Sequence, residues 1–190
     1  MSGNMRLFVG LSLPDVVRAA LSRLQSDLRV GRLVAPENLH LTLAFLDDQD
    51  LPTAEAVNEL LEGLKAPAFD LRIAGLDLFD PARPRIVFAA AERSEALVSL
   101  RKKVRAAVRD AGVILPRERF RPHVTLARLG RDLPQFELDK LGAFLESHGD
   151  FALDPFQIDR FGLFRSILGP DGPEYDLLAE YMLDDPAPRP

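Results

Sequence analysis

The sequence predicts an α+β fold with a bilobal pseudo-two-fold duplication, in which two antiparallel sheets line a central cleft and helices lie on the outside. Three observations predict it. The tetrapeptide His-Leu-Thr-Leu at residues 40–43 returns as His-Val-Thr-Leu at 123–126. Apolar spacing gives the same order of elements in both halves, namely strand, helix, histidine strand, helix, strands. The opening strands, at Leu7 and Ile86, are 79 positions apart and the histidines 83, a drift that loop insertions produce.

The first half begins with a short apolar strand at residues 5–11. Pro14 suits the first turn of a helix that we expect to end at Gly31. The apolar face of this helix is Val17, Leu21, Leu24 and Leu28. A loop at 35–38 leads into the first histidine strand, 39–46.

An acidic turn at 47–50 follows, and Thr53 is expected to cap the second helix. The apolar face of the second helix is Val57, Leu60, Leu61 and Leu64. Strands within 69–79 close the first half.

The second half starts after the Pro-rich segment 80–84, with a strand at 85–91. Ser94 is expected to cap a helix that Gly112 stops. The apolar face of this helix is Leu97, Leu100, Val104 and Val108. The remaining elements are the second histidine strand at 122–129, a helix at 136–145 and strands within 156–167.

These elements predict one bilobal domain over residues 1–190, with one repeat at about 5–80, a second at about 84–168 and a C-terminal tail at 184–190. Composition fits a soluble globular protein, because 47% of the residues are hydrophobic and 28% charged. Neither a membrane-spanning stretch nor a signal peptide is recognisable. The absence of cysteine excludes thiolate chemistry and fits the cytoplasm, and a net charge of −5 argues against a basic nucleic-acid coat. We expect a monomer.

The two histidine strands suggest acid–base chemistry. Residues two apart share one face of a strand, so His40 lies on the face of Thr42, and His123 on the face of Thr125. Imidazoles titrate near neutrality, and one neutral and one protonated ring make an acid–base pair. With two threonine hydroxyls beside them, such rings fit a phosphate that is attacked in line.

Arginines gather around the second motif: Arg117, Arg119, Arg121, Arg128 and Arg131. Guanidinium groups suit phosphate oxygens. Arg128 follows His123 by five residues, and Phe45 follows His40 by five. An odd offset points a side chain to the opposite face of a regular strand, so both residues reach the histidine face only if a bulge re-aims them. We expect Arg117, Arg119 and Arg121 to form a solvated rim, with the steering of RNA as their alternative role.

The chain resembles the RNA 2′,3′-cyclic phosphodiesterases, historically called 2′-5′ RNA ligases, of the two-histidine phosphoesterase superfamily. The resemblance rests on residues 6–9, 36–43, 120–128 and 164–166. It implies a bilobal fold and opening of RNA terminal 2′,3′-cyclic phosphates, or of small cyclic nucleotides, to a 2′-phosphate. The resemblance implies no metal or other cofactor. It also implies reversible joining of RNA ends through 2′-5′ bonds. Phe164 stands where many relatives have tyrosine, so no hydroxyl contact is expected there.

Residue by residue, the resemblance implies that His40 and His123 are the catalytic pair and that Thr42 and Thr125 hold the phosphate. It further implies that Arg128 binds the phosphate and that Phe45 packs on the terminal base. Our hypothesis is that His40 is the proton donor and His123 the proton acceptor.

Two rival functions remain open from the sequence. A metal hydrolase could use both histidines, although no third ligand at a recognisable spacing accompanies them. A non-catalytic RNA-end or nucleotide-binding module on the same fold would keep the arginines and make the histidines dispensable.

Overall fold

The computed structural model describes residues 3–170 and 172–185. Its helices are α1 (Asp15–Gln25), α2 (Leu51–Glu62), α3 (Glu95–Asp110) and α4 (Gln135–Ser147), with a 3-10 turn η1 (Pro36–Asn38). Its strands are β1 (Met5–Ser12), β2 (Arg32–Leu33), β3 (His40–Gln49), β4 (Phe69–Leu71), β5 (Ile73–Phe79), β6 (Ile86–Ala91), β7 (His123–Arg128), β8 (Phe156–Ile158), β9 (Arg160–Gly169) and β10 (Gly172–Met182). Within these described ranges, no helix is both long and apolar enough to span a membrane.

Most strands belong to one antiparallel sheet, ordered β10-β9-β1-β3-β7-β6-β5 with β2 beside β7, and β4 pairs with β8 in a second sheet. The predicted α+β fold with antiparallel sheets is confirmed. The larger sheet has two halves, because β3 and β7 share only the pair Leu41–Val124. We call β10-β9-β1-β3 the first half-sheet and β7-β6-β5 the second.

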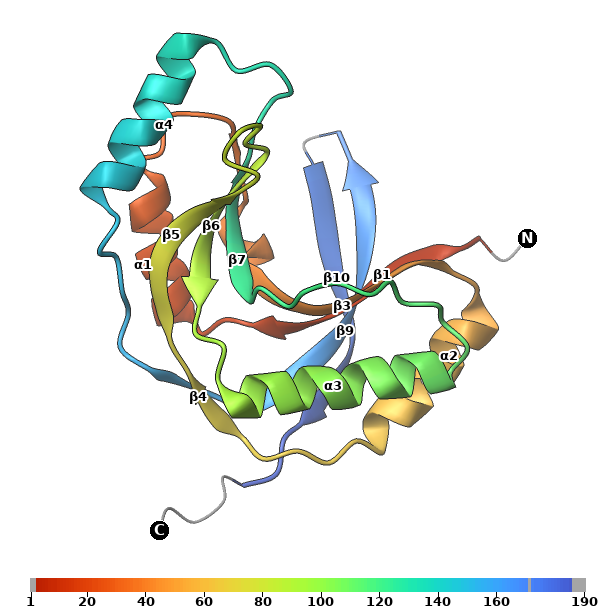
Figure 1. Cartoon of the computed structure of the whole chain (residues 1–190). Coiled ribbons are helices and arrows are strands. Elements are labelled where there is room, and N and C mark those ends of the chain that lie inside the picture. Colours follow the sequence, from red (N-terminus) through yellow and green to blue (C-terminus); the bar gives the residue numbers. More distant parts are fainter. Residues whose placement is uncertain (1–2, 171, 186–190) are drawn as a thin grey trace.

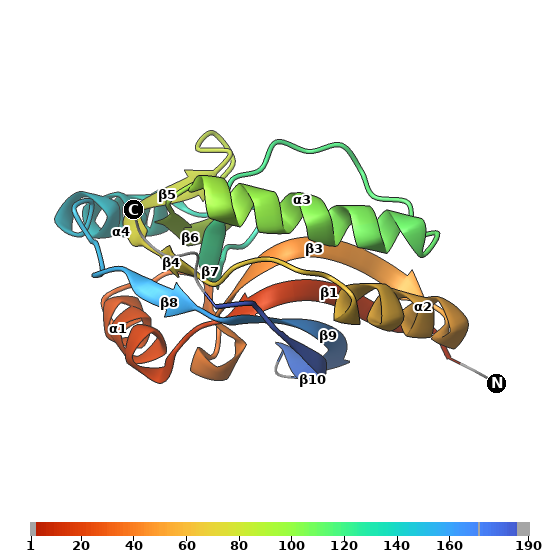
Figure 2. The same cartoon turned by 90° about the horizontal axis from the view of Figure 1, so that it is seen from below.

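Helices cover the outside of both half-sheets. Figures 1 and 2 both place α1 and α4 beside the second half-sheet, and α2 and α3 beside β1 and β3 of the first. The amphipathic faces explain this packing. The predicted apolar face of α3, from Leu97 to Val108, is fully buried, and so is that of α1 at Val17, Leu21 and Leu24.

Gln25 explains how α1 meets the second half-sheet. This side chain is buried, and its amide donates hydrogen bonds to the carbonyl oxygens of Val34 (2.8 Å) and Leu126 (2.9 Å). A buried polar group is tolerated when it is hydrogen-bonded in this way. The helix ends at Gln25 rather than near Gly31, although Leu28 beyond it is buried as expected.

Several element boundaries differ from the prediction. The N-cap of α2 is Asp50, whose carboxylate accepts the backbone N–H of Thr53, so the expected cap at Thr53 is wrong. Leu60 is 40% exposed and lies outside the apolar face of α2. The caps of α3 are confirmed, because Ser94 accepts the N–H of Leu97 and Gly112 follows the helix at φ +90°.

β10 was not predicted, and it forms an edge of the large sheet. It carries a bulge between Leu177 and Ala179, which leaves both Leu177 and Leu178 exposed and breaks the alternation that marks a strand. The start of the predicted tail is also ordered, because Asp184 exchanges backbone hydrogen bonds with Ala66 and Ala68. Residues 186–190 of that tail lie outside the described residues.

The strand pairing carries the signature of a two-fold relation. Leu41 and Val124 occupy the same place in the two tetrapeptides, and they pair with each other. In β4 and β8, Asp70 pairs with Gln157, 87 positions along, the same separation as between Leu71 and Ile158. An element that pairs with its own equivalent lies on a two-fold axis. We infer that a pseudo-two-fold axis passes through both contacts.

The predicted repeats exchange their closing strands. β5, at the end of the first repeat, pairs with β6 of the second repeat. Conversely, β9 of the second repeat pairs with β1 of the first. Each half-sheet therefore contains an opening strand and a histidine strand from one repeat and a closing strand from the other.

Candidate active site

The pair Leu41–Val124 places both histidine motifs on one face of the sheet. Both residues of this pair are fully buried, and an antiparallel pair directs the flanking side chains to the opposite face. The register sets His40 across from Thr125, and Thr42 across from His123. All four of these side chains are half-buried. Diagonal neighbours in such a pair are about 7–8 Å apart, a distance that one phosphate group can bridge between two imidazoles.

Bulges re-aim the residues at the odd offset. In β7, Thr125 pairs with Phe88 and Ala127 with Val87, so Leu126 is an extra residue in the strand. Leu126 and Ala127 are consequently both buried, and Arg128 is exposed. The extra residue returns Arg128 to the face of His123, as a bulge does.

The same irregularity occurs in β3. Thr42 pairs with Gly10 and Ala44 with Val9, so Leu43 is the extra residue there. Phe45 then emerges on the histidine face, where its side chain is 57% exposed. Phe45 and Arg128 line one common pocket, so the two bulges bring both predicted residues together.

Both imidazoles are held by the backbone in the same way. Nδ1 of His40 lies 2.7 Å from the carbonyl oxygen of Asn38, and Nδ1 of His123 lies 2.7 Å from that of Arg121. A carbonyl oxygen only accepts, so Nδ1 carries the proton in each ring and Nε2 keeps the lone pair of the neutral form.

The two Nε2 atoms have different surroundings. Nε2 of His40 lies 3.0 Å from Oγ1 of Thr42, which donates to it when the ring is neutral. Nε2 of His123 hydrogen-bonds to no group in the described part of the chain. The lone pair of His123 is therefore the freer of the two to accept a proton.

Burial keeps both rings neutral near pH 7. Desolvation lowers the pKa of His40 from 6.5 to about 4, against the opposing effect of the Asn38 hydrogen bond, and the nearby charges of His123 and Arg128 lower it further. The pKa of His123 is also lowered, first by desolvation and then by Arg121 and Arg128. Arg128 thus acts on the pKa of both rings, and His123 acts on that of His40, as expected of charges in neighbouring positions.

Aromatic side chains that the sequence analysis did not single out enclose each imidazole. His40 packs against Phe8 (centroids 4.7 Å apart) and, edge-on, against Tyr175 (5.1 Å). His123 packs edge-on against Phe79 (4.8 Å) and tilted against Phe88 (5.2 Å). These rings account for the desolvation of both histidines. Phe8 and Phe88 lie in the two opening strands. This repeated placement was the signal in the sequence that could have identified them as neighbours of the histidines.

Two pockets share Phe45 in their lining. The Thr42 pocket, of about 140 Å³, is lined by Thr42, Phe45, Phe79, Arg119, Arg121 and His123 among others. The Tyr175 pocket, of about 250 Å³, is lined by Arg6, Phe8, Phe45, Asp47, Arg128 and Tyr175 among others. The exposed Phe45 ring therefore borders both spaces.

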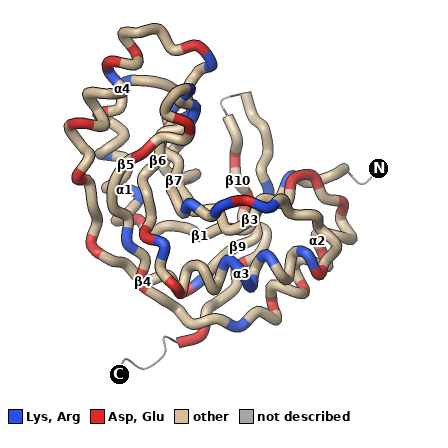
Figure 3. The backbone as a smooth tube through the Cα atoms, viewed as in Figure 1, with Lys and Arg blue, Asp and Glu red and all other residues tan. Residues whose placement is uncertain are grey.

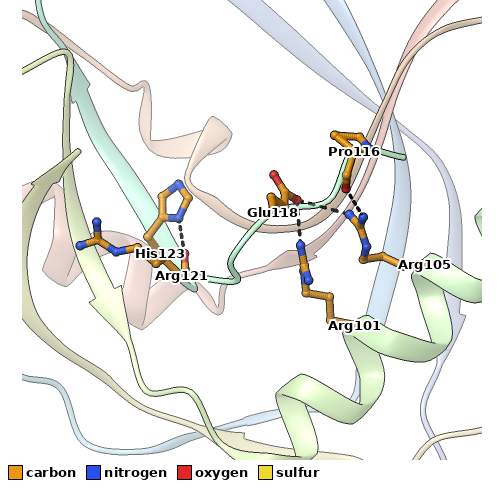
Figure 4. Close-up of polar contacts among 6 residues, drawn as sticks. All are labelled: Arg101, Arg105, Pro116, Glu118, Arg121 and His123. Atoms are coloured by element: carbon orange, nitrogen blue, oxygen red, sulfur yellow. Dashed lines mark hydrogen bonds and ion pairs between the residues drawn. The ribbon is translucent and has the colours of Figure 1, made fainter. Parts of the chain in front are cut away.

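A clamp holds the loop that precedes β7 (Figure 4). Glu118 accepts hydrogen bonds from Arg101 (2.7 Å) and Arg105 (3.3 Å) of α3, and Arg105 also donates to the carbonyl oxygen of Pro116 (2.5 Å). The same loop supplies the Arg121 carbonyl that orients His123. The clamp therefore fixes the backbone on which the His123 ring depends. The Glu118 carboxylate also opposes the lowering of the His123 pKa.

The arginine rim is only partly free. Arg121 pairs with Asp77 at 2.9 Å, and its guanidinium lies over the rings of Phe79 and Phe88. Arg119 lines the Thr42 pocket and is exposed. The third histidine, His148, lies elsewhere, at the end of α4, and pairs with Asp27 at 3.2 Å.

Phe164 is only 9% exposed, yet it pairs with Phe8 and stacks on its ring (centroids 5.0 Å apart), so it lies on the histidine face of the sheet, beside the ring that packs on His40. Among residues 3–170 and 172–185, no three His, Cys, Asp or Glu side chains lie close enough together to hold a metal ion.

Known proteins resemble this chain over most of its length. The model of the 2′-5′ RNA ligase superfamily matches residues 13–169. An RNA 2′,3′-cyclic phosphodiesterase of Thermus thermophilus is 36% identical over 192 residues, covering 94% of this chain and 90% of the relative. One from Aeropyrum pernix is 31% identical over 153 residues, covering 78% and 84%.

Solved structures share the fold. The protein TT0787 of Thermus thermophilus superposes with a TM-score of 0.75 at 32% identity, covering 95% of this chain and 99% of that one. LigT of E. coli, complexed with 3′-AMP, gives a TM-score of 0.75 at 24% identity, covering 96% and 99%.

Proposed function

Because the chain belongs to the 2′-5′ RNA ligase superfamily, we propose that it hydrolyses the terminal 2′,3′-cyclic phosphate of RNA, or of small cyclic nucleotides, to a 2′-phosphate. The relatives named RNA 2′,3′-cyclic phosphodiesterase support this substrate class. The observation that carries the proposal is the pair Leu41–Val124, around which both histidines and both threonines share one face of the sheet. A cytoplasmic monomer fits the proposal.

In the proposed reaction, water attacks phosphorus in line with the departing O3′. His123 accepts a proton from the water through its unengaged Nε2. His40 donates a proton to O3′ as the P–O3′ bond breaks, which leaves a 2′-phosphate and a free 3′-hydroxyl. One proton is taken up and one released, so the pair ends with its protons exchanged. The same sequence of steps, with a 5′-hydroxyl in place of water, would join RNA ends through a 2′-5′ bond.

A donor must carry a proton, whereas His40 is neutral at pH 7 in the phosphate-free site. The negative charge of the substrate phosphate favours the protonated ring, so substrate binding raises the pKa of the pair. The hydrogen bond from Nδ1 to Asn38 supports the protonated form of His40 as well.

The other site residues act on the phosphate and the base. Thr42 and Thr125 donate their hydroxyl protons to the non-bridging oxygens, and Arg128 supplies a positive charge from the adjoining pocket. Phe45, exposed in the lining of both pockets, offers a face on which the terminal base stacks. None of these roles requires a metal ion.

Incubation with an oligonucleotide that ends in a 2′,3′-cyclic phosphate tests the function. We expect turnover that is undiminished in excess EDTA, with the product phosphate on O2′. Loss of activity in chelator, with recovery on adding a divalent metal, would favour the metal hydrolase. A product phosphate on O3′ would overturn the assignment of the leaving group.

The pH profile is expected to be bell-shaped and displaced to the acidic side. Activity is lost above the higher pKa, because the donor loses its proton, and below the lower pKa, because the acceptor gains one. Both histidine pKa values are lowered, so the maximum of kcat/KM should lie below pH 6.5. The kcat profile should lie at higher pH, because bound phosphate raises both values. A flat profile between about pH 5 and pH 9 would contradict the acid–base pair.

A further inference from the structure

Positive charge that no carboxylate balances gathers beside His123. Arg93, at the start of the turn into α3, and Arg119, on the loop before β7, are exposed and form no ion pair with any described residue. Arg93 is near enough to Arg101 for its positive charge to lower the pKa of the Arg101 guanidinium. Figure 3 shows the loop crossing the centre of the view with basic segments on both sides of a single acidic one.

Neighbouring arginines are committed to the protein itself. Arg101 and Arg105 share Glu118, and Arg121 is paired with Asp77. Arg93 and Arg119, by contrast, are available for an external anion, as is Arg117 on the same loop. In a chain whose net charge is −5, a local excess of positive charge points to an anionic partner.

These two arginines line one pocket of about 610 Å³, which we call the Arg93 pocket. The Arg93 pocket and the Thr42 pocket share Arg119, Phe120 and Arg121, so only this short segment separates them. The Arg93 pocket also reaches Phe88, which packs on the His123 ring. An anion in the Arg93 pocket would therefore lie next to the space around His123, where the reacting phosphate is proposed to bind.

We propose that the Arg93 pocket binds the phosphodiester that precedes the terminal nucleotide of a single-stranded RNA, an inference that rests on the proposed function. A cyclic phosphate held between His40 and His123 leaves the preceding phosphate one nucleotide away. Charge decides on which side it lies. The Arg93 pocket is lined by Arg93, Arg119 and Arg121 against the single carboxylate of Asp77. In the Tyr175 pocket, Arg128 is assigned to the reacting phosphate, and the remaining Arg6 is paired with Asp47 at 3.7 Å, which leaves no excess of positive charge for a phosphodiester.

The test compares a cyclic mononucleotide with oligonucleotides of two to four residues that share its terminal nucleotide. We expect kcat/KM of the wild type to rise with the first added phosphodiester. The double variant Arg93→Gln/Arg119→Gln should lose roughly tenfold on the oligonucleotides, and Arg93→Gln alone, which leaves the lining of the Thr42 pocket intact, should change little on the mononucleotide. A matched control is Arg23→Gln/Arg109→Gln, which removes two exposed arginines on the outer helices and should preserve the length dependence.

Binding gives a readout that does not need turnover. With a fluorescently labelled oligouridylate ending in a 2′-phosphate, the double variant should lower the salt dependence of log K by about one. An equal loss on mononucleotide and oligonucleotide, or an unchanged length preference and salt slope, would overturn the proposal. The proposal would also be overturned if Arg6→Gln, rather than the double variant, reduced the length preference and the salt dependence. Absence of any turnover by the wild type would instead refute the proposed function, and the binding measurement would still decide the site.

Discussion

Replacing either cleft histidine, in His40→Ala or His123→Ala, is expected to reduce kcat by ~10²–10⁴-fold, the contribution of one member of a general acid–base pair. The rings act as a unit, because each transfers a proton only while the other does. The double variant should therefore be little worse than either single one. Single-turnover rates on a cyclic-phosphate oligonucleotide measure the effect separately from product release.

His148→Ala is the matched control, since it removes the remaining histidine, which lies at the end of α4 and pairs with Asp27. Its activity should equal that of the wild type. Thermal unfolding of all variants separates lost chemistry from lost folding, since both cleft rings pack against aromatic neighbours. If both cleft variants kept full turnover, the non-catalytic binding module would be the better interpretation.

Removing a threonine hydroxyl should have the next largest effect. Thr42→Val and Thr125→Val keep the shape of the side chain and delete one donor to the phosphate oxygens, which should cost ~10²-fold in kcat by analogy with a lost oxyanion donor. The loss should fall on kcat rather than on KM, because charge on the non-bridging oxygens develops in the transition state.

Thr42→Ser and Thr125→Ser supply the comparison, because serine retains the hydroxyl and removes only a methyl group. Each serine variant should recover most of the activity that valine loses. A serine variant as slow as the valine variant would assign the threonines to packing rather than to phosphate binding.

The repeated motif allowed the central features of this protein to be predicted from its sequence. Strict alternation in residues 40–43 and 123–126 predicts which side chains share a face, and the structure brings all four polar ones around a single strand pair. Helix α3 was predictable for the same reason, since its apolar spacing and its cap at Ser94 agree.

Other features depend on tertiary contacts that local patterns do not carry. The bulges at Leu43 and Leu126 arise in the pairing with β1 and β6. The sequence of the histidine strands shows only that Phe45 and Arg128 need a bulge to reach the histidine face, and not that a bulge forms. Asp50 competes with Thr53 as a cap, and only the path of β3 up to Gln49 decides between them. Strand β10 pairs along a single edge and contains a bulge, so its apolar residues lack a clear period. The aromatic rings around each histidine come from two separate strands, β1 and β10 for His40 and β5 and β6 for His123.

The exchange of closing strands has a consequence for the origin of the chain. A lone ancestral repeat would expose the edge of its opening strand and lack the partner that covers it. Two copies would remove that defect in each other, and their contact would create the two-histidine centre at the same time. Association and catalysis would then have arisen together in a homodimer, and gene fusion would have made the union permanent.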